Sequence, residues 1–538
     1  MDVEYSNKVK DLVDSLKWIC QDNWLWWDAN EYKIVTQSFL YKFLNDKFLY
    51  ELQKIDPKLQ SYSDIKSLSE SEYKILLMKL WVKWAQLKPE HLLPYLFEHQ
   101  NDDDIAKKFD ETLNDIAIQN TWIFSVHTSE NTDIRLFEES LIQSAVADKT
   151  KHNKVARWII NKLINCKFDF NEIFSQWFDF FSTIFEYMIK DYNKDWGWKY
   201  AEYYTPHSVS KVIAKVLVWD DKIENVTVYD PAAGSGTLLM NLANEIWVNK
   251  CTIYSQDINQ KSTNLLRLNL ILNNLTHSIN HIVQWNTITE SRHKNKMDFI
   301  VSNPPFKLDF SDWRDDIEQL PNSQERFFAG VPTIPNKKKE SMAIYLLFIQ
   351  HILYSLSDNW KAAIVVPTGF ITAQSWIEKK IREKIVDKNW LKWVVSMPSN
   401  IFATTWTNVS VIFIDKTRKE WEDMILIDAS KLWETVKEWK NQKTYLRDNE
   451  QQQIIDTFKN MEVIEDFSVK VTNKQTKEKN YSWSAGQYFE IKIEHIDITP
   501  EEFESRMNEY KHNLKSHFEE WKKLENNIFN QLEELKYG

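Results

Sequence analysis

The sequence predicts an α/β protein with a mostly parallel β-sheet, a helical region before the sheet and one long helix after it. Between about residues 170 and 415, short β-rich segments alternate with helical ones, which is typical of parallel strands joined by crossover helices. The chain has 538 residues, of which 43 % are hydrophobic and 14 % aromatic, so it is long and apolar enough for several cores.

The first 165 residues are predicted to form a helical domain. Apolar residues recur at steps of three and four in Tyr32–Leu52 and Ser71–Leu87, and the alternation typical of a strand is scarce. We find no catalytic motif in residues 1–165, and we expect this domain to serve packing or partner binding.

Residues 166–498 are predicted to form the catalytic domain around the sheet. The expected strands are Val226–Tyr229, Cys251–Gln256, Met297–Ser302, Ala362–Val366, Trp393–Ser396 and Val409–Ile414. The expected helices between them are Thr237–Val248, Lys261–Asn273, Met342–Leu356 and Ser375–Asp387. Because the later strands follow one another closely, the sheet can add an antiparallel strand at its edge.

Residues 499–538 are predicted to form one amphipathic helix. Thr499, Pro500 and Glu502 supply an N-cap, a first-turn proline and the glutamate of a capping box. Apolar residues then recur at steps of three or four from Phe503 to Leu535, on one side of the helix. This side can pack on the same chain or dock on another subunit, and the pattern fits both.

Charge and cysteine content limit the compartment and the partners. A net charge of -11 makes the chain a poor non-specific DNA binder, because phosphates are neutralised by clustered Lys and Arg. No apolar segment approaches the roughly 20 residues that span a bilayer, and the N-terminus lacks the apolar core of a signal peptide. Cys20, Cys166 and Cys251 form no closely spaced pair. We expect a reduced, soluble, cytoplasmic protein without a metal site or a membrane contact.

Glycine is unusually rare and tryptophan unusually common. The chain has 7 glycines and 25 tryptophans, whereas average glycine usage would give about 38 glycines. Trp196, Trp198, Trp360 and Trp406 stand where turns or caps are expected, and Trp360 in particular stands where a left-handed helix cap is expected. We interpret many of the tryptophans as glycines, encoded by UGA in an organism that reads this codon as glycine. Genuine enrichment in tryptophan is the alternative.

A nucleoside site is predicted at the end of the first strand of the sheet. Asp230 ends this strand, and Gly234 and Gly236 precede the helix that begins at Thr237, so the backbone can approach a ligand at the helix N-terminus. Asp257 ends the next strand about 20 residues later, where an acid that binds ribose hydroxyls is expected. No P-loop lysine follows the glycines. A purely structural tight turn is the alternative.

A second motif ends the strand Met297–Ser302. Pro304 and Pro305 fix φ and remove two N–H donors, which leaves nearby carbonyl groups free to face a ligand. Asn303 adds an acceptor oxygen and Phe306 adds an aromatic face. A rigid turn between strand and loop is the alternative.

Together these motifs resemble those of the amino-methyltransferases that modify adenine N6 in DNA, and more narrowly those of the modification (M) subunits of type I restriction-modification systems. The segments that carry the resemblance are DPAAGSGT at 230–237, NPPF at 303–306, KYAEYYTP at 199–206, AAIVVPTG at 362–369, SMPSNIF at 396–402, NEYK at 30–33 and KFLNDK at 42–47. Where such subunits usually have glycine, this chain has Trp177, Trp196, Trp198, Trp285, Trp360, Trp376, Trp393 and Trp406.

The resemblance implies a Rossmann-like sheet and S-adenosyl-L-methionine as the methyl donor. The residues implied to bind it are Tyr204, Thr205, Pro206, Asp230, Ala232, Gly234, Ser235, Gly236, Thr237, Asp257 and Asn286. Asn286 stands where many of these enzymes have an aspartate near the cofactor adenine. The residues implied to be catalytic are Asn303, Pro304, Pro305 and Phe306. Phe306 would stack on a base flipped out of the duplex.

The resemblance also implies partners: double-stranded DNA, a DNA specificity (S) subunit, and a restriction (R) subunit with helicase and nuclease, with two copies of this chain per complex. The sequence has no recognisable module for reading DNA and no P-loop, which agrees with separate subunits for those tasks. One alternative is a methyltransferase acting on glutamine N5 of proteins, and another is an inactive cofactor-binding scaffold. The intact residues Asp230, Asn303 and Phe306 count against the scaffold.

Overall fold

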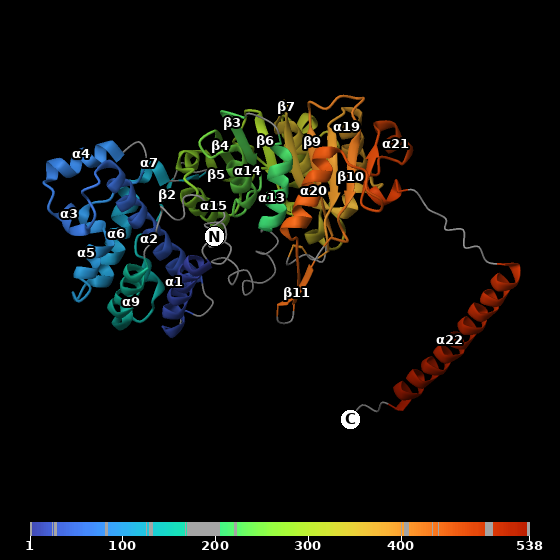
Figure 1. Ribbon diagram of the computed structural model, residues 1–538, viewed down its shortest axis with the longest axis horizontal. Coiled ribbons are helices and arrows are strands. Elements are labelled where there is room, and N and C mark those ends of the chain that lie inside the picture. The colour runs from blue at the N-terminus through green and yellow to red at the C-terminus, as the bar shows by residue number, and fades with distance from the viewer. Residues whose placement is uncertain are drawn as a thin grey trace. The chain divides into compact units, whose positions relative to one another are not determined.

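The computed structural model of the protein is drawn in Figure 1. It describes residues 3–23, 25, 29–80, 84–124, 126–128, 133–166, 168, 205–219, 223–399, 401–402, 408–432, 434–438, 441–489 and 499–534. The chain divides into two compact units, Met1–Tyr488 and Phe489–Gly538, which are taken in turn below.

A large sheet forms the centre of the first unit. Its described strands follow the order β13-β10-β8-β9-β7-β6-β3-β4-β5-β1-β2. Their bounds are β1 Val126–Thr128, β2 Asp133–Ile134, β3 Val226–Asp230, β4 Cys251–Asp257, β5 Ile282–Gln284, β6 Met297–Ser302, β7 Leu356–Pro367, β8 Leu391–Ser396, β9 Val409–Asp415, β10 Met424–Asp428 and β13 Ser468–Val471. A separate hairpin pairs β11 Glu434–Glu438 with β12 Asn441–Tyr445.

The direction of the strands confirms the parallel sheet and corrects one detail. From β7 through β6, β3, β4 and β5 to β1, each strand is parallel to its neighbour. The antiparallel strand β9 lies between β7 and β8, inside the sheet, and not only at an edge as predicted. A run of apolar residues does not distinguish a central from an edge strand, so the sequence pattern could not place β9 inside the sheet. Antiparallel strands β13 and β2 also stand at the two edges.

Helices cover the sheet; those near residues 237–248, 261–273, 342–356 and 375–387 were predicted from the sequence, whereas those near residues 207–217 and 448–460 were not. The covering helices are α13 His207–Leu217, α14 Thr237–Ile246, α15 Gln260–Leu272, α18 Tyr345–Ser355, α19 Trp376–Asp387 and α20 Asp448–Asn460. Helix α13 packs against both α14 and α20 and lies in front of the sheet in the view of Figure 1. Every residue of β9 is buried, as expected for a strand covered on both faces.

Strand β7 is longer than predicted, and this corrects the expectation for Trp360. Helix α18 ends at Ser355 and β7 starts at once, so no left-handed cap separates helix from strand. Trp360 lies within β7, and its ring packs against Phe299 with 5.0 Å between the ring centroids. A register shift of β6 against β7, between Met297 and Phe299, accommodates the residues between Leu356 and Lys361.

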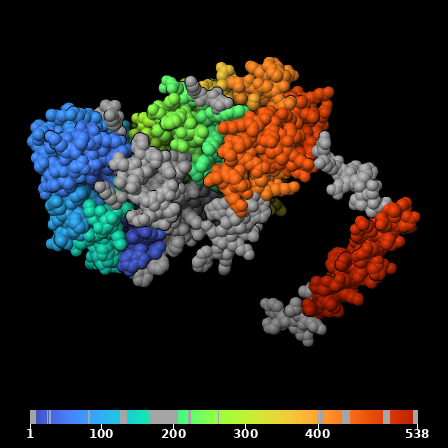
Figure 2. Space-filling view, viewed as in Figure 1, coloured from blue at the N-terminus to red at the C-terminus, as the bar shows by residue number. Residues whose placement is uncertain are grey.

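The N-terminal helices form a continuous body, coloured blue to teal in Figure 2. They are α1 Val3–Asp22, α2 Ala29–Ile55, α3 Tyr62–Lys66, α4 Glu70–Leu80, α5 Leu93–Glu98, α6 Ile105–Gln119, α7 Thr121–Phe124, α8 Leu141–Ala145 and α9 His152–Asn165. The predicted helix Tyr32–Leu52 lies within α2. The predicted helix Ser71–Leu87 is too long, because residues 84–88 are not helical.

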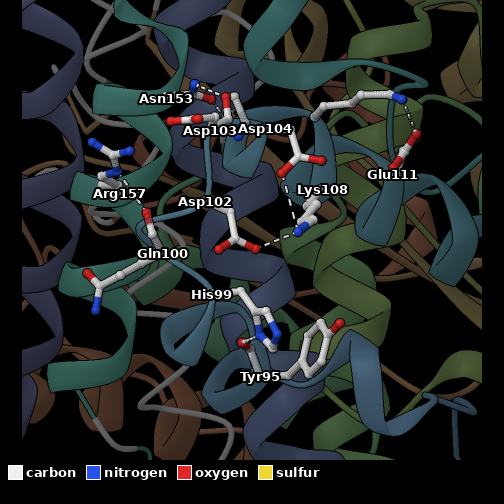
Figure 3. Close-up of polar contacts among 12 residues, drawn as sticks. Tyr95, His99, Gln100, Asp102, Asp103, Asp104, Lys108, Glu111, Asn153 and Arg157 are labelled. Atoms are coloured by element: carbon white, nitrogen blue, oxygen red, sulfur yellow. Dashed lines mark hydrogen bonds and ion pairs between the residues drawn. The ribbon is translucent and has the colours of Figure 1, made fainter.

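A polar cluster joins α5, α6 and α9 through the loop between α5 and α6 (Figure 3). Arg157 of α9 donates to the carbonyl oxygen of Gln100 at 2.7 Å, and Asn153 donates to that of Asp103. Lys108 of α6 forms ion pairs with Asp102 and Asp104. These bonds fix the loop at a helix junction, where Asp102 and Asp104 act through their carboxylates and Asp103 through its backbone carbonyl group.

The same N-terminal region also extends the catalytic sheet. Strand β1 pairs with β5, and β2 pairs with β1, so two strands from before residue 166 complete one edge. Arg267 of α15 is buried and donates to the carbonyl oxygen of Phe124 at the end of α7. These strands were not predicted, because each is at most three residues long and too short to show a pattern in the sequence. The division at residue 165 itself stays a prediction.

The second unit contains the predicted C-terminal helix, α22, at Pro500–Glu534. Its capping box is present: the backbone N–H of Glu502 donates to Thr499 Oγ1, and that of Thr499 donates to the Glu502 carboxylate, both at 3.2 Å. Its apolar stripe is exposed, with Leu514 60 % and Phe518 59 % accessible. Among the helices that the structure describes, none is long and apolar enough to cross a membrane.

Candidate active site

The glycine turn joins β3 to α14 and needs two left-handed residues. Gly234 has φ 54° and Gly236 has φ 82°, and Gly236 is the N-cap of α14. A Cβ atom at Gly236 would stand 2.2 Å from Leu266 Cδ1, so the buried Leu266 side chain would have to shift, and the positive φ itself strains any residue other than glycine. The turn therefore places the N-terminus of α14 beside the end of β3.

Asp230 is a buried carboxylate at the end of β3. It is 1 % exposed and accepts hydrogen bonds from the backbone N–H of Ala232 at 2.9 Å and from Ser302 Oγ at 2.8 Å. Burial, with a smaller contribution from the charge of Asp257, raises its pKa to about 7. No cationic side chain forms an ion pair with Asp230 in the described part of the chain. A cation bound at this place would therefore be strongly favoured.

Asp257 stabilises the glycine turn from the neighbouring strand. One carboxylate oxygen accepts from the N–H of Gly234 at 3.0 Å, and the other accepts from that of Asn259 at 2.8 Å. Burial raises the pKa of this carboxyl group as well. The structure thus brings Asp257 to the turn, as predicted, and its role toward ribose hydroxyls stays a prediction.

Asn303 stands across from Asp230, directly after β6. It is 8 % exposed, and its Nδ2 donates to Thr205 Oγ1 at 3.1 Å. This bond uses the donor end of the amide. The acceptor oxygen Oδ1 receives no hydrogen bond from the described residues and stays available to a ligand. Pro304 is buried and Pro305 half-buried.

A small, partly open hollow joins the two motifs. Of the predicted residues, Thr205, Asp230, Ala232, Ser235, Thr237 and Asn303 line it. Ala233 and Leu238 complete its lining and were not predicted. Pro206 lies just outside the hollow as the N-cap of α13. Tyr204 lies outside the described residues.

Asn286 lies in the loop after β5, which packs against the glycine turn. Its Oδ1 accepts from the backbone N–H of Ile288 at 3.0 Å, so the side chain caps its own turn. Thr287 Oγ1 donates to the carbonyl oxygen of Pro231 at 2.7 Å. The structure therefore places Asn286 in a loop beside the glycine turn but not in the lining of the hollow. Nothing in the sequence singles out Thr287.

Phe306 is half-buried and begins a row of aromatic rings. Its ring meets Tyr345 edge to face at 6.3 Å, and Tyr345 meets Phe370 in the same way at 6.0 Å. These contacts hold Phe306 from behind and leave part of its ring exposed.

Ser302, which donates a hydrogen bond to Asp230, is a further site residue that was not predicted, although its position just before Asn303 could have indicated it.

No group of three or more metal-ligating side chains gathers anywhere in the described ranges. The polar groups of the site are instead two carboxylates, an amide and hydroxyls around a glycine turn. Such a set can bind a cationic ligand and accept hydrogen bonds from a planar amino group.

The chain is similar to proteins named as methylase subunits. It is 26 % identical over 499 residues to the type I restriction enzyme MpnII methylase subunit of Mycoplasma pneumoniae, covering 88 % of each chain. It is 27 % identical over 457 residues to the MjaIX methylase subunit of Methanocaldococcus jannaschii, covering 79 % of this chain and 76 % of that one.

The fold is shared with a solved structure from Streptococcus thermophilus, described as a type I restriction-modification system methyltransferase subunit. The TM-score is 0.71 at 21 % identity, over 90 % of this chain and 100 % of the other. Residues 176–496 match the family model described as N-6 DNA Methylase. This match spans more than half of the sequence and contains both motifs of the site. The chain therefore belongs to the N-6 DNA methylase family.

Proposed function

We propose that this chain is the modification subunit of a type I restriction-modification complex. In this role it transfers a methyl group from S-adenosyl-L-methionine to N6 of adenine in a specific DNA sequence. The observation that carries the proposal is the orientation of Asn303: Thr205 holds its amide nitrogen, and its oxygen, which accepts no hydrogen bond from the described residues, stands at the hollow that contains Asp230.

The residues at the hollow fit the methyl donor. Asp230 is a buried carboxylate whose pKa is raised to about 7, and it suits the ammonium group of the methionine part. The glycine turn at the N-terminus of α14 allows close backbone approach, and Asp257 stands at the end of the next strand, where ribose hydroxyls are expected. When bound, the cofactor supplies a methyl group on a positively charged sulfur that leaves as a neutral thioether.

The chemical task of the protein is to make the adenine amino nitrogen reactive. Its lone pair is delocalised into the ring, so it points away from an incoming methyl group. Asn303 Oδ1 and the carbonyl oxygen of Pro304 would each accept one N–H bond, which favours a tetrahedral nitrogen whose lone pair faces the methyl carbon. These acceptors stabilise the positive charge that develops on nitrogen as the N–C bond forms and the S–C bond breaks. The surplus proton then passes to water.

The target base must leave the duplex to reach this site. The half-buried ring of Phe306 stands just after Pro305 and is held by Tyr345, so it offers a rigid face for stacking. Stacking of this kind contributes about 1–3 kcal/mol per base. Phe306 therefore orients the flipped adenine, and Asn303 acts on its amino group.

The proposed partners are double-stranded DNA, an S subunit and an R subunit. Similarity to relatives named type I restriction enzyme methylase subunits supports this assignment. A net charge of -11 also agrees with a chain that needs a partner to hold DNA. Two copies of this chain per complex follow from the same assignment.

The experiment is a methylation assay of the complex with labelled S-adenosyl-L-methionine and DNA. Asn303→Ala should lower the rate at least about a hundredfold, in the range of removing one preorganised acceptor or donor, while cofactor binding persists. A near-normal rate for Asn303→Ala would refute the mechanism. Transfer of label to a protein acceptor, and not to DNA, would favour the glutamine N5 reaction instead.

A further inference from the structure

Arg326 is a deeply buried cation with no acidic partner among the described residues. It ends the short helix α17, Ser323–Arg326, and is 1 % exposed. Its guanidinium donates to the carbonyl oxygen of Thr287 at 2.5 Å, to that of Ile288 at 2.9 Å and to His351 Nδ1 at 3.0 Å. Burial lowers its pKa only to about 10, so it stays charged at neutral pH.

Two of these bonds hold the loop that packs on the cofactor side of the glycine turn. Thr287 Oγ1 donates to the carbonyl oxygens of Pro231, at 2.7 Å, and Gln256, at 3.3 Å. The backbone N–H of Trp285 donates to the carbonyl oxygen of Asp257 at 2.9 Å. The loop of residues 285–290 is thus fixed to β3 and β4 on one side and to Arg326 on the other.

The third bond reaches the strand that carries Asp230. A guanidinium Nε can only donate, so His351 Nδ1 accepts and, in the neutral ring, Nε2 carries the hydrogen. His351 Nε2 then donates to Tyr229 Oη at 3.2 Å, and Tyr229 directly precedes Asp230. Burial and the charge of Arg326 both lower the pKa of His351, which keeps the ring neutral.

We propose that Arg326 is a positioning residue for the methyl donor. It fixes the loop 285–290 and, through His351, the end of β3 in the arrangement that binds S-adenosyl-L-methionine, although it does not line the hollow. The inference rests on the proposed function. Lysine cannot replace it, because one ammonium group cannot reproduce the planar fork that reaches two carbonyl oxygens and a ring nitrogen.

The test is equilibrium dialysis of the full-length chain with labelled S-adenosyl-L-methionine. Arg326→Lys should raise the Kd about tenfold or more. Arg418→Lys is the matched control: Arg418 is 4 % exposed and donates to Asn389, Glu422 and Asn473, next to the turn that follows β9. Both variants should lower the midpoint of thermal unfolding, but only Arg326→Lys should change the Kd. A Kd within twofold of the wild type would overturn the proposal.

A second pair of variants decides the outcome if Arg326→Lys does not fold. Thr287→Val removes the hydroxyl bond to Pro231 without changing charge, and it should weaken cofactor binding several-fold, whereas Thr287→Ser should restore it. Unchanged binding in Thr287→Val would then overturn the positioning role. Failure of the wild-type chain to bind S-adenosyl-L-methionine would instead refute the proposed function.

The backbone at Trp247 carries a second, independent inference. This residue follows α14 with φ 83° and ψ 122°, and its side chain is 70 % exposed. The other positive-φ residues that the structure describes outside glycine have φ from 50° to 61° and include four asparagines. A bulky residue at φ 83° is strained, and its exposed indole gains no burial in return.

Exposure varies widely among the described tryptophans. Trp376 begins α19 and Trp421 lies in the turn between β9 and β10, and they are 74 % and 81 % exposed. In contrast, Trp483 is 1 % exposed and packs edge to face on Phe370, with 5.8 Å between the ring centroids. Trp421 stands in a turn, where glycine is typical, and Trp376 stands at a position where the subunits that the sequence resembles usually have glycine, whereas Trp483 fills the core.

We infer that the native polypeptide has glycine at 247, 376 and 421 and tryptophan at 483, because UGA is read as glycine in the source organism. The codons decide this directly: UGA is expected at the first three positions and UGG at 483. Mass spectrometry of peptides from the native host should find glycine at 247. UGG at 247, or tryptophan in the native peptide, would overturn the inference.

Discussion

Asp230 meets two opposing demands at the level of a single residue. In the free protein, its burial at the end of β3 raises the pKa to about 7. Between the ordinary pKa of a carboxyl group and this value, the folded protein keeps a proton that the unfolded chain has lost. The buried carboxyl group therefore lowers the free energy of unfolding as the pH rises toward 7. The site keeps this destabilising group because a bound cation interacts with its charged form.

Cofactor affinity should depend on pH through this group. Binding of a cation favours the carboxylate, so it releases a proton wherever the free site is protonated. As the pH increases toward about 7, the affinity for S-adenosyl-L-methionine should rise about tenfold per pH unit, and above this pH it should stay constant. Calorimetry across this range measures it.

The control for this pH dependence is Asp230→Asn. This variant should bind weakly at every pH and should be more stable than the free wild type above pH 7. A flat affinity profile in the wild type would contradict the role of Asp230.

The sequence predicted the residues whose chemistry is visible in a motif. Asn303 and Asp230 stand at strand ends beside prolines or glycines, and the structure brings both to one hollow. It could not predict Arg326 or Thr287, because their roles depend on backbone carbonyl groups that only the fold brings within reach. Nor could it place Asn286, whose side chain bonds its own loop.

At the scale of elements, the α14 turn has little tolerance for change. Gly236→Ala would force a Cβ atom against the buried side chain of Leu266 and would keep φ at 82°. We expect a loss of about 1–3 kcal/mol in the free energy of unfolding, measured with denaturant, together with weaker cofactor binding.

Gly486→Ala is the matched control for this prediction. Gly486 has an ordinary φ and open space around it, so alanine there should be neutral or stabilise the protein by up to about 1 kcal/mol. Equal effects of the two substitutions would show that the left-handed turn is not the cause.

The order of strands shows where sequence patterns stop being informative. Apolar runs predicted β3, β4, β6, β8 and β9 within one or two residues. A central strand and an edge strand can have the same pattern of apolar residues in the sequence. The place of β9 between β7 and β8 therefore depends on tertiary packing. Strand β1 has no pattern of its own and exists because β5 offers it a partner edge.

In the molecule as a whole, the chemical site and the long helix belong to different units. The complete hollow lies within Met1–Tyr488, whereas α22 belongs to Phe489–Gly538. The helix is capped at its start and has an exposed apolar stripe that includes Leu514 and Phe518. An apolar helix face of this kind fits docking to another helix, and the proposed S subunit is the partner that the assignment supplies.

This division predicts that assembly and cofactor binding can be separated by substitution on α22. Leu514→Glu places a charge in the centre of the stripe and should weaken binding of the S subunit more than tenfold, in the range of an interface hot spot. Ser516→Glu adds the same charge two residues later, on the opposite side of the helix, and should have little effect. Co-purification with the S subunit measures assembly, and equilibrium dialysis measures cofactor binding, which should not change in either variant. If both variants assemble normally, the stripe does not dock the S subunit. If Leu514→Glu loses cofactor binding as well, α22 acts on the fold of the catalytic unit and not on assembly.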